Sequence, residues 1–203
     1  QGDVGSGKTI VAALAAAGVT RVAVTLHVGY GTFKPIRAGL EDHVVDPEAF
    51  TLGKNIAITP GKVVHETPLY QLLQYSPTTE SVLELPLVIF PPWINRFYIL
   101  DLSPQKSFIR WAAEQGVTVF VVSWKSADES MKDVLWDDYI RAQLDAINTV
   151  RERLGVKAVH TIGYCVAGTT LAATLAILAR RGEADKVKSA TFFTVGSRSA
   201  AFA

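Results

Sequence analysis

The sequence from residue 85 onward alternates between short, continuously apolar runs and longer stretches whose apolar residues recur every three or four positions. The apolar runs, which we expect to be strands, are residues 85–90, 117–124, 158–164 and 189–194, and the expected helices are residues 103–115, 132–154 and 166–181. A continuous apolar run is typical of a strand that is buried on both faces of a parallel sheet. Strand–helix–strand units repeated in this way predict the α/β class, with a doubly wound, mostly parallel sheet that carries helices on both faces.

Two of the expected helices have clear signals at their ends. Ser103 is expected as the N-cap residue of the first helix, with Pro104 in its first turn, where a missing N–H leaves no hydrogen bond unmade. Gly116 follows that helix, and Gly155 ends the helix of residues 132–154, as glycines commonly do after a helix. The sequence therefore predicts the limits of these helices as well as their presence.

The composition fits one globular domain and excludes several functional classes. Hydrophobic residues make up 49% of the 203, which is enough for a core and excludes an intrinsically disordered chain. The 20 basic and 19 acidic residues leave a net charge of +1, so we expect no nucleic-acid partner. No apolar run reaches the roughly 18 residues of a membrane-spanning helix. The single cysteine excludes an internal disulfide and fits a reducing compartment, so we expect a cytoplasmic protein.

That single cysteine, Cys165, lies directly between an expected strand and an expected helix, in the sequence Gly-Tyr-Cys-Val-Ala-Gly. A tight strand-to-helix turn of this kind is the context of a nucleophile elbow, which needs small residues two positions before and after the nucleophile. Gly163 and Ala167 meet that need, although the strict pattern has glycine at both places. The turn would also aim the N–H of Val166 at an oxyanion formed on an attacked carbonyl. The alternative is that Cys165 is a small buried hydrophobe, as most free cysteines are.

From about residue 49 to 194, some seven-tenths of the chain, the sequence resembles the catalytic core of the polyhydroxyalkanoate synthases. The phrases that carry the resemblance are residues 70–75, 91–102, 120–124, 136–140 and the turn at 163–168, in the order and spacing of that family. The resemblance implies a partial α/β-hydrolase fold and an acyltransferase of polyhydroxyalkanoate synthesis. Such an enzyme moves (R)-3-hydroxyacyl groups from CoA onto a cysteine as a thioester, and then onto a growing polyester.

Carried onto this sequence, the resemblance makes Cys165 the catalytic nucleophile and the Val166 N–H one oxyanion donor. The loop after the first core strand should supply the second donor, which we expect to be the N–H of Ile94. The implied partners are hydroxyacyl-CoA, the polyester chain, a second subunit in a homodimer and the surface of cytoplasmic storage granules. The resemblance implies no metal and no cofactor, and no metal-ligand motif such as Cys-x-x-Cys or His-Glu-x-x-His is present.

Aromatic residues are frequent in this region, and two roles are open for them. The set is Trp93, Phe97, Tyr98, Trp111, Trp124, Trp136 and Tyr139. We expect them mainly to pack in the core, because aromatic side chains bury the largest area per residue. The alternative is that they line a channel for an acyl substrate.

The sequence departs from the family pattern at the catalytic triad, in which acid and histidine follow the nucleophile along the chain. The four histidines, at positions 27, 43, 65 and 160, all precede Cys165, so the fold is expected to be truncated before the acid and the histidine. His160 lies on the strand that leads to Cys165 and is expected to be a core or edge residue. Asp185 lies in a helix-to-strand connection and is a poor triad acid. Without a general base we expect this polypeptide alone not to polymerise at a normal rate.

Residues 1–18 contain a complete match to the phosphate-binding G-x-x-x-x-G-K-[ST] pattern and resemble the first motif of ATP-dependent branch-migration DNA helicases. In such a loop the backbone around Gly2, Gly5 and Gly7 wraps the phosphates, Lys8 reaches the β- and γ-phosphates, and Thr9 holds magnesium. The sequence has no strand before this loop and no convincing acidic partner after it. ATP and magnesium are therefore expected only under the alternative of a P-loop ATPase or helicase fragment.

Residues 19–48 contain a strand-like run at 22–26 and a glycine turn, and resemble a piece of the S-adenosylmethionine:tRNA ribosyltransferase-isomerase. We therefore expect an N-terminal annex of mixed resemblance at residues 1–48 and a synthase-type core at residues 49–203. Three resemblances in one chain leave a second alternative open, a non-catalytic chimeric fragment.

Overall fold

The computed structural model describes residues 22–25 and 50–194, and the main feature of this part is a seven-stranded sheet. Its strands, in spatial order, are β1 (Val22–Thr25), β9 (Val187–Phe193), β8 (Val159–Tyr164), β4 (Leu87–Phe90), β7 (Val119–Trp124), β3 (Tyr70–Tyr75) and β2 (Gly61–Glu66). A separate two-stranded sheet contains β5 (Asp101–Ser103) and β6 (Lys106–Ser107). Within the strand-like run at residues 22–26, Val22–Thr25 are confirmed as a strand, β1.

Five neighbouring strands, from β1 to β7, pair in parallel, while β3 runs antiparallel to both β7 and β2. The mostly parallel, doubly wound sheet is therefore confirmed, with an antiparallel hairpin at one edge that the strand–helix alternation did not predict. Strand β2 lies at the sheet edge and its residues are exposed or half-buried, so it lacks the continuous apolar run of a central strand.

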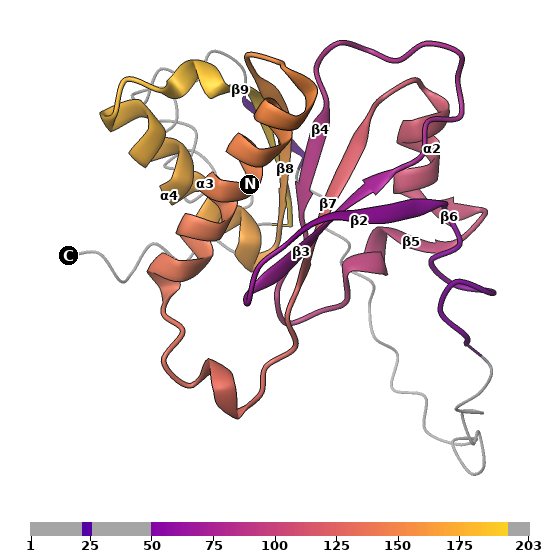
Figure 1. Ribbon diagram of the computed structural model, residues 1–203, viewed down its shortest axis with the longest axis horizontal. Coiled ribbons are helices and arrows are strands. Elements are labelled where there is room, and N and C mark those ends of the chain that lie inside the picture. Colours follow the sequence, from indigo (N-terminus) through magenta and orange to yellow (C-terminus); the bar gives the residue numbers. More distant parts are fainter. Residues whose placement is uncertain (1–21, 26–49, 195–203) are drawn as a thin grey trace, which may run out of the picture.

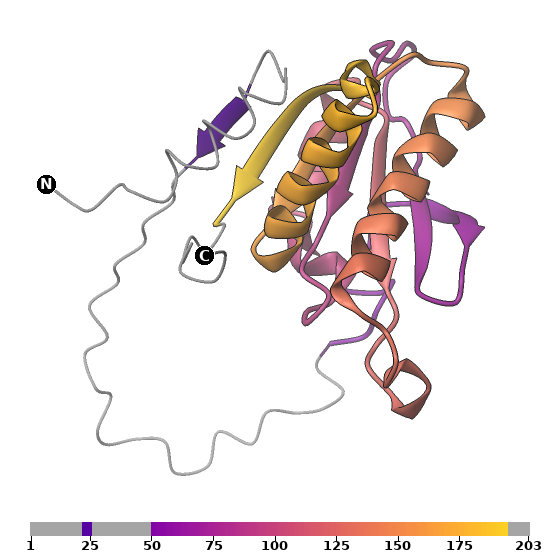
Figure 2. The same ribbon diagram turned by 90° about the vertical axis from the view of Figure 1, so that its left-hand side faces the viewer.

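Helices cover both faces of this sheet (Figures 1 and 2). Helices α3 (Trp136–Leu154) and α4 (Val166–Arg180) lie on one face, and α2 (Phe108–Glu114) packs on the other. Successive residues of β4 divide between the two cores, because side chains along a strand alternate in direction: Val88 joins the α3–α4 core and Ile89 joins the α2 core. Burial on both faces explains why the parallel strands read as unbroken apolar runs.

Helix α2 begins later than the sequence predicts. Ser103 ends β5 and does not cap the helix; the N-cap residue is Ser107, whose side chain accepts the Arg110 N–H at 2.9 Å. Pro104 lies in the turn between β5 and β6, where its fixed φ suits the reversal of the chain. The serine–proline pair is thus a turn signal here. The C-terminal end is as predicted, with Gly116 at φ 78°.

The remaining helices follow the sequence closely. Helix α3 starts at Trp136, four residues after the expected start, because the Asp138 carboxylate accepts the Leu135 N–H at 2.8 Å and closes the first turn. Gly155 ends it at φ 66°, as predicted. The described residues also contain three short 3₁₀ segments: η1 (Phe97–Leu100), η2 (Glu129–Met131) and η3 (Ala184–Lys186). In the part of the chain that the structure describes, no helix has the length and apolar character to cross a membrane.

Candidate active site at the carboxyl edge of the sheet

Cys165 occupies the single residue between the end of β8 and the start of α4, and its backbone is in an unusual conformation. Its φ is 55° and its ψ is −127°, which places a residue with a Cβ in the left-handed half of φ space. Such a conformation costs on the order of 1–3 kcal/mol and persists only where the surroundings hold it. Two hydrogen bonds do so: the Cys165 N–H donates to Phe193 at 2.8 Å, and the Gly168 N–H donates to the Cys165 carbonyl at 2.9 Å.

The space around this turn explains its small residues. A Cβ added at Gly163 would lie 2.6 Å from the Cα of Gly168 and 2.9 Å from Cδ2 of Leu171, so β8 and α4 meet there without room for a side chain. Ala167 is fully buried. Gly163 must therefore be a glycine because it packs against Gly168. The sequence pattern had instead indicated Ala167, one residue earlier.

Val166 is the first residue of α4, where a backbone N–H has no acceptor within the helix. Cys165, at the same turn, is half-buried. A reacting carbonyl bound to this sulfur would have the N-terminal end of α4 beside it, and helix N-termini stabilise negative charge. The oxyanion role of the Val166 N–H stays a prediction.

The loop that contains Ile94 follows β4, the neighbour of β8 in the sheet. Phe90 at the end of β4 is in register with Gly163, so this loop and the Cys165 turn leave the same edge of the sheet side by side. The Trp124 indole N–H donates to the Pro91 carbonyl at 2.7 Å and anchors the start of the loop. The Ile94 side chain is 79% exposed. The role of its N–H as second oxyanion donor stays a prediction.

Most of the aromatic residues gather around Trp93 at this edge of the sheet. Its ring stacks on Tyr139 at 4.1 Å between centroids and meets Trp124 and Trp136 edge-on at 6.2 and 5.5 Å. Trp124 is nearly buried, whereas Trp136 is 44% exposed. Trp111, in contrast, lies on α2, with 55% of its side chain exposed. The centre of the cluster, at Trp124, is therefore part of the core, and its rim, at Trp136, is exposed.

Neither described histidine lies beside Cys165. His160 is at the other end of β8, five residues earlier, which is about 16 Å along a strand. Its Nδ1 is 2.6 Å from the hydroxyl oxygen of Ser189 on β9. Burial, together with the nearby Lys188 ammonium, lowers the pKa of His160. His160 therefore lies on the strand that leads to Cys165, as the sequence predicted. Asp185, which lies in η3 at the start of β9, is exposed and equally remote from the turn.

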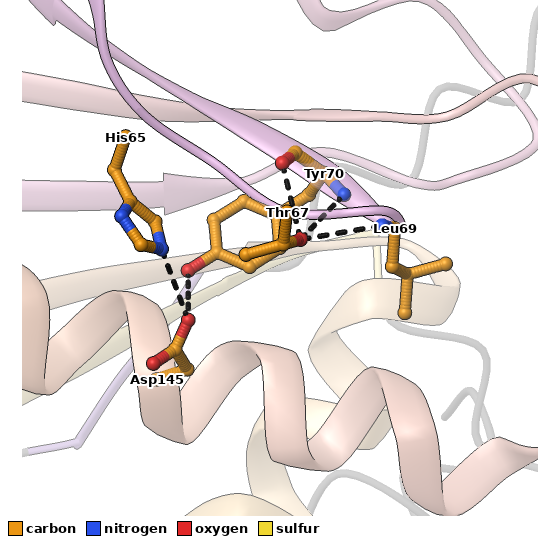
Figure 3. A network of polar contacts seen from close by, with 5 residues as sticks. All are labelled: His65, Thr67, Leu69, Tyr70 and Asp145. Atoms are coloured by element: carbon orange, nitrogen blue, oxygen red, sulfur yellow. Dashed lines mark hydrogen bonds and ion pairs between the residues drawn. The ribbon is translucent and has the colours of Figure 1, made fainter.

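His65 belongs to a polar network that the sequence analysis missed (Figure 3). The Asp145 carboxylate on α3 accepts the Tyr70 hydroxyl at 2.6 Å, and the same oxygen lies 3.3 Å from Nε2 of His65. Burial and the Asp145 carboxylate both raise the pKa of Tyr70. Strand β2 is four places from β8 in the sheet, or about 19 Å at ordinary strand spacing, so His65 is remote from the Cys165 turn.

A second missed feature is the amide of Gln143 on α3, which is completely buried against α4. It could have been noticed in the sequence, because position 143 falls on the same helical face as the apolar residues Ile140 and Ile147. Within residues 22–25 and 50–194, no group of three acidic, histidine or cysteine side chains could hold a metal ion. The phosphate-loop residues Gly2, Gly5, Gly7, Lys8 and Thr9 lie outside the described residues.

The sequence of this chain is similar to known poly(3-hydroxyalkanoate) polymerases. Residues 31–112 match the family model described as "Poly-beta-hydroxybutyrate polymerase (PhaC) N-terminus". The chain is 49% identical over 159 residues to a poly(3-hydroxyalkanoate) polymerase subunit PhaC of Rhizobium meliloti, covering 78% of this chain and 26% of that protein. Against the polymerase of Methylorubrum extorquens the identity is 51% over 150 residues, covering 73% and 25%. The chain thus spans about a quarter of the length of these curated relatives.

Solved structures that resemble this chain include esterases. Esterase 2 of Thermogutta terrifontis, phosphoramylated by tabun, is 17% identical with a TM-score of 0.47, covering 71% of this chain and 58% of that one. An esterase of Rhizomucor miehei is 16% identical with a TM-score of 0.46, covering 67% and 43%. The fold assignment does not depend on them, because the parallel sheet and the strand–Cys165–helix turn are those of a partial α/β-hydrolase fold.

The comparisons also bear on the N-terminal resemblances. They support neither the helicase motif at residues 1–18 nor the ribosyltransferase-isomerase segment at residues 19–48. The polymerase match starts at residue 31, inside the second of these segments. Over most of its length, therefore, this chain is related in sequence to the poly(3-hydroxyalkanoate) polymerases and carries part of an α/β-hydrolase fold.

Proposed function

We propose that this chain contributes the nucleophile of a poly(3-hydroxyalkanoate)-forming acyltransferase. In the first step the Cys165 sulfur attacks the thioester carbonyl of an (R)-3-hydroxyacyl-CoA. The bond from carbon to the CoA sulfur breaks, and CoA leaves as the thiol with the proton that Cys165 gave up. In the second step a hydroxyl oxygen attacks the enzyme thioester, so an ester bond forms and Cys165 is released with its proton restored. The observation that carries this proposal is a cysteine at positive φ between β8 and α4.

Each step passes through a tetrahedral intermediate with a negatively charged oxygen. We assign the stabilisation of this oxygen to the N–H groups of Val166 and Ile94. These residues lie in the segments that follow β8 and β4 at the same edge of the sheet. Preorganised donors of this kind each contribute about 10²–10³ to the rate. Trp93 lies in the loop after β4, at the same sheet edge as the Cys165 turn, and we infer that the exposed rim of the aromatic cluster receives the apolar acyl chain.

The reaction also requires a base that takes the thiol proton. His65 and His160 are both remote from the turn, so we infer that the base comes from residues outside 22–25 and 50–194. The expectation that the 203-residue chain alone does not polymerise at a normal rate follows from this and stays a prediction. The implied homodimer and granule surface also stay predictions of the family resemblance.

The proposal is tested by thioester formation. The folded chain is incubated with (R)-3-hydroxybutyryl-CoA and added imidazole, which supplies an external base, and the intact mass is followed with time. We expect one hydroxyacyl group per chain, on Cys165, and none on the Cys165→Ala variant.

The urea-unfolded chain is the matched control, because it has the same thiol without the turn. We expect the folded chain to acylate at least about tenfold faster, since oriented donors act only in the folded state. Equal rates for the folded and unfolded chains, or an adduct that persists in the Cys165→Ala variant, would contradict the proposal.

A further inference from the structure

The side chain of Gln143 is an amide placed in the apolar core between α3 and α4, with no exposed surface. A buried amide is costly unless its polar atoms are hydrogen-bonded. Its Nε2 donates to the carbonyl of Ala167 and to the hydroxyl of Thr170, both at 3.0 Å. Its Oε1 lies 2.8 Å from the hydroxyl of Thr174, which donates to it. Every polar atom of this amide thus bonds to one face of α4.

Two of these contacts are in the first turns of α4, immediately after the proposed nucleophile. Ala167 is the second residue after Cys165, and its carbonyl receives hydrogen bonds both from Gln143 and from the Thr170 hydroxyl at 3.0 Å. On the sheet side, the Cys165 N–H is held by Phe193 of β9. The strained turn is therefore held from β9 on one side and from α3 on the other.

We propose that Gln143 is a positioning residue for acyl transfer: from α3 it fixes the first turn of α4 and so sets the Val166 N–H relative to the Cys165 sulfur. This inference rests on the proposed function. The physical reason is that residues in sparsely populated backbone conformations keep them only where the surrounding contacts over-determine the geometry. A small displacement of an oxyanion donor lowers the rate of the chemical step while leaving substrate binding intact.

The hydroxyls on α4 allow the amide to be removed without leaving other buried groups unpaired. Thr170 bonds to the Ala167 carbonyl, and Thr174 lies 2.9 Å from the Thr170 carbonyl, so both hydroxyls keep backbone acceptors when Gln143 is replaced. Gln143→Met is the appropriate variant, because methionine has a similar length and is apolar. Thr170→Val, which removes one acceptor of the amide, is a second and milder variant.

The test is single-turnover acylation by (R)-3-hydroxybutyryl-CoA with imidazole present, well below the unfolding temperature. For Gln143→Met we expect the maximal acylation rate to fall about tenfold, with the half-saturating acyl-CoA concentration unchanged within about twofold. For Thr170→Val we expect a smaller fall, by about threefold. Leu178→Ala is the control, because Leu178 is buried in the last turn of α4 and its loss lowers stability far from Cys165.

A second readout does not require catalysis. Hydrogen exchange at the Gly168 amide, which bonds to the Cys165 carbonyl, should become about tenfold faster in Gln143→Met and stay unchanged in Leu178→Ala. If the wild-type chain fails to acylate, the proposed function is wrong, and the exchange rates still decide whether Gln143 holds the turn. If the wild type acylates and Gln143→Met keeps its rate and its exchange protection, the positioning role is wrong.

Discussion

Gly163 on β8 packs against the backbone of α4 at Gly168, so closely that no side chain fits between them. This contact lies beside the turn that contains Cys165. For Gly163→Ala we expect a loss of unfolding free energy near the upper end of the usual overpacking range, about 3 kcal/mol, because the clashing Gly168 atom is backbone and cannot rotate away. Urea unfolding followed by circular dichroism measures this loss.

Gly182→Ala is the matched control for that substitution. Gly182 has a φ of 72° and no atom within 4 Å of an added Cβ, so the variant tests backbone strain alone, about 1 kcal/mol. Equal losses for the two variants would show that the close approach of β8 and α4 has no energetic weight.

A second residue-scale prediction concerns pH and His160. Its pKa is lower in the folded chain than the value of about 6.5 that it has when unfolded, so below that pH the unfolded state binds the extra proton. The stability contributed by neutral His160 is therefore present above pH 6.5 and is lost as the pH falls through the folded-state pKa.

His160→Asn keeps a donor near Ser189 and removes the titration. We expect the variant to lose less unfolding free energy than the wild type between pH 7 and pH 5, as measured by urea titrations at each pH. Parallel pH dependence in the two proteins would refute this reading.

At the scale of the element, the start of α2 is fixed by the hydrogen bond of its N-cap residue. The Ser107 hydroxyl accepts the Arg110 N–H, so Ser107→Ala should lower the free energy of unfolding by about 1 kcal/mol. Ser103→Ala, at the position that the sequence favoured as the cap, should change it by less than about 0.5 kcal/mol, since Ser103 ends β5 instead. Thermal unfolding of the two variants distinguishes these expectations, and the reverse order would place the start of α2 at Ser103.

At the scale of the whole molecule, the antiparallel hairpin β2–β3 is joined to the helical layer by the Tyr70–Asp145 hydrogen bond (Figure 3). We expect Tyr70→Phe to lower the unfolding free energy by about 1 kcal/mol, because Asp145 is half-exposed and water replaces part of the lost bond. The dependence of that free energy on urea concentration should not change, because the β3–β7 ladder still holds the hairpin in the sheet.

Tyr98→Phe is the control for that variant, because it also removes a tyrosine hydroxyl but Tyr98 lies in η1, outside the hairpin and α3. Its unfolding free energy should match that of the wild type within about 0.5 kcal/mol. A weaker urea dependence in Tyr70→Phe would instead indicate that the hairpin detaches before the rest of the sheet unfolds.

The sequence predicted those parts of the fold that have a periodic local signal. Strands β4, β7, β8 and β9 and helices α3 and α4 were found within a few residues of their expected limits, because their burial leaves an apolar pattern. Strand β2 was missed because it is an exposed edge strand that needs no apolar run, and β3 was missed because Gln71 and Gln74 interrupt its apolar residues. The cap at Ser103 was wrong, because the serine–proline signal also fits a turn.

For the candidate site, the amino-acid sequence alone determined the strand-to-helix turn at Cys165. Only certain residue types tolerate a sharp strand-to-helix reversal, so Gly163, Cys165 and Ala167 mark it locally. Tertiary structure alone decided what surrounds it: the Gln143 amide from α3, and the loop of Ile94 at the same sheet edge as the Cys165 turn. These partners come from segments far apart in sequence, and no local pattern encodes a contact that exists only once two helices and a sheet have packed together.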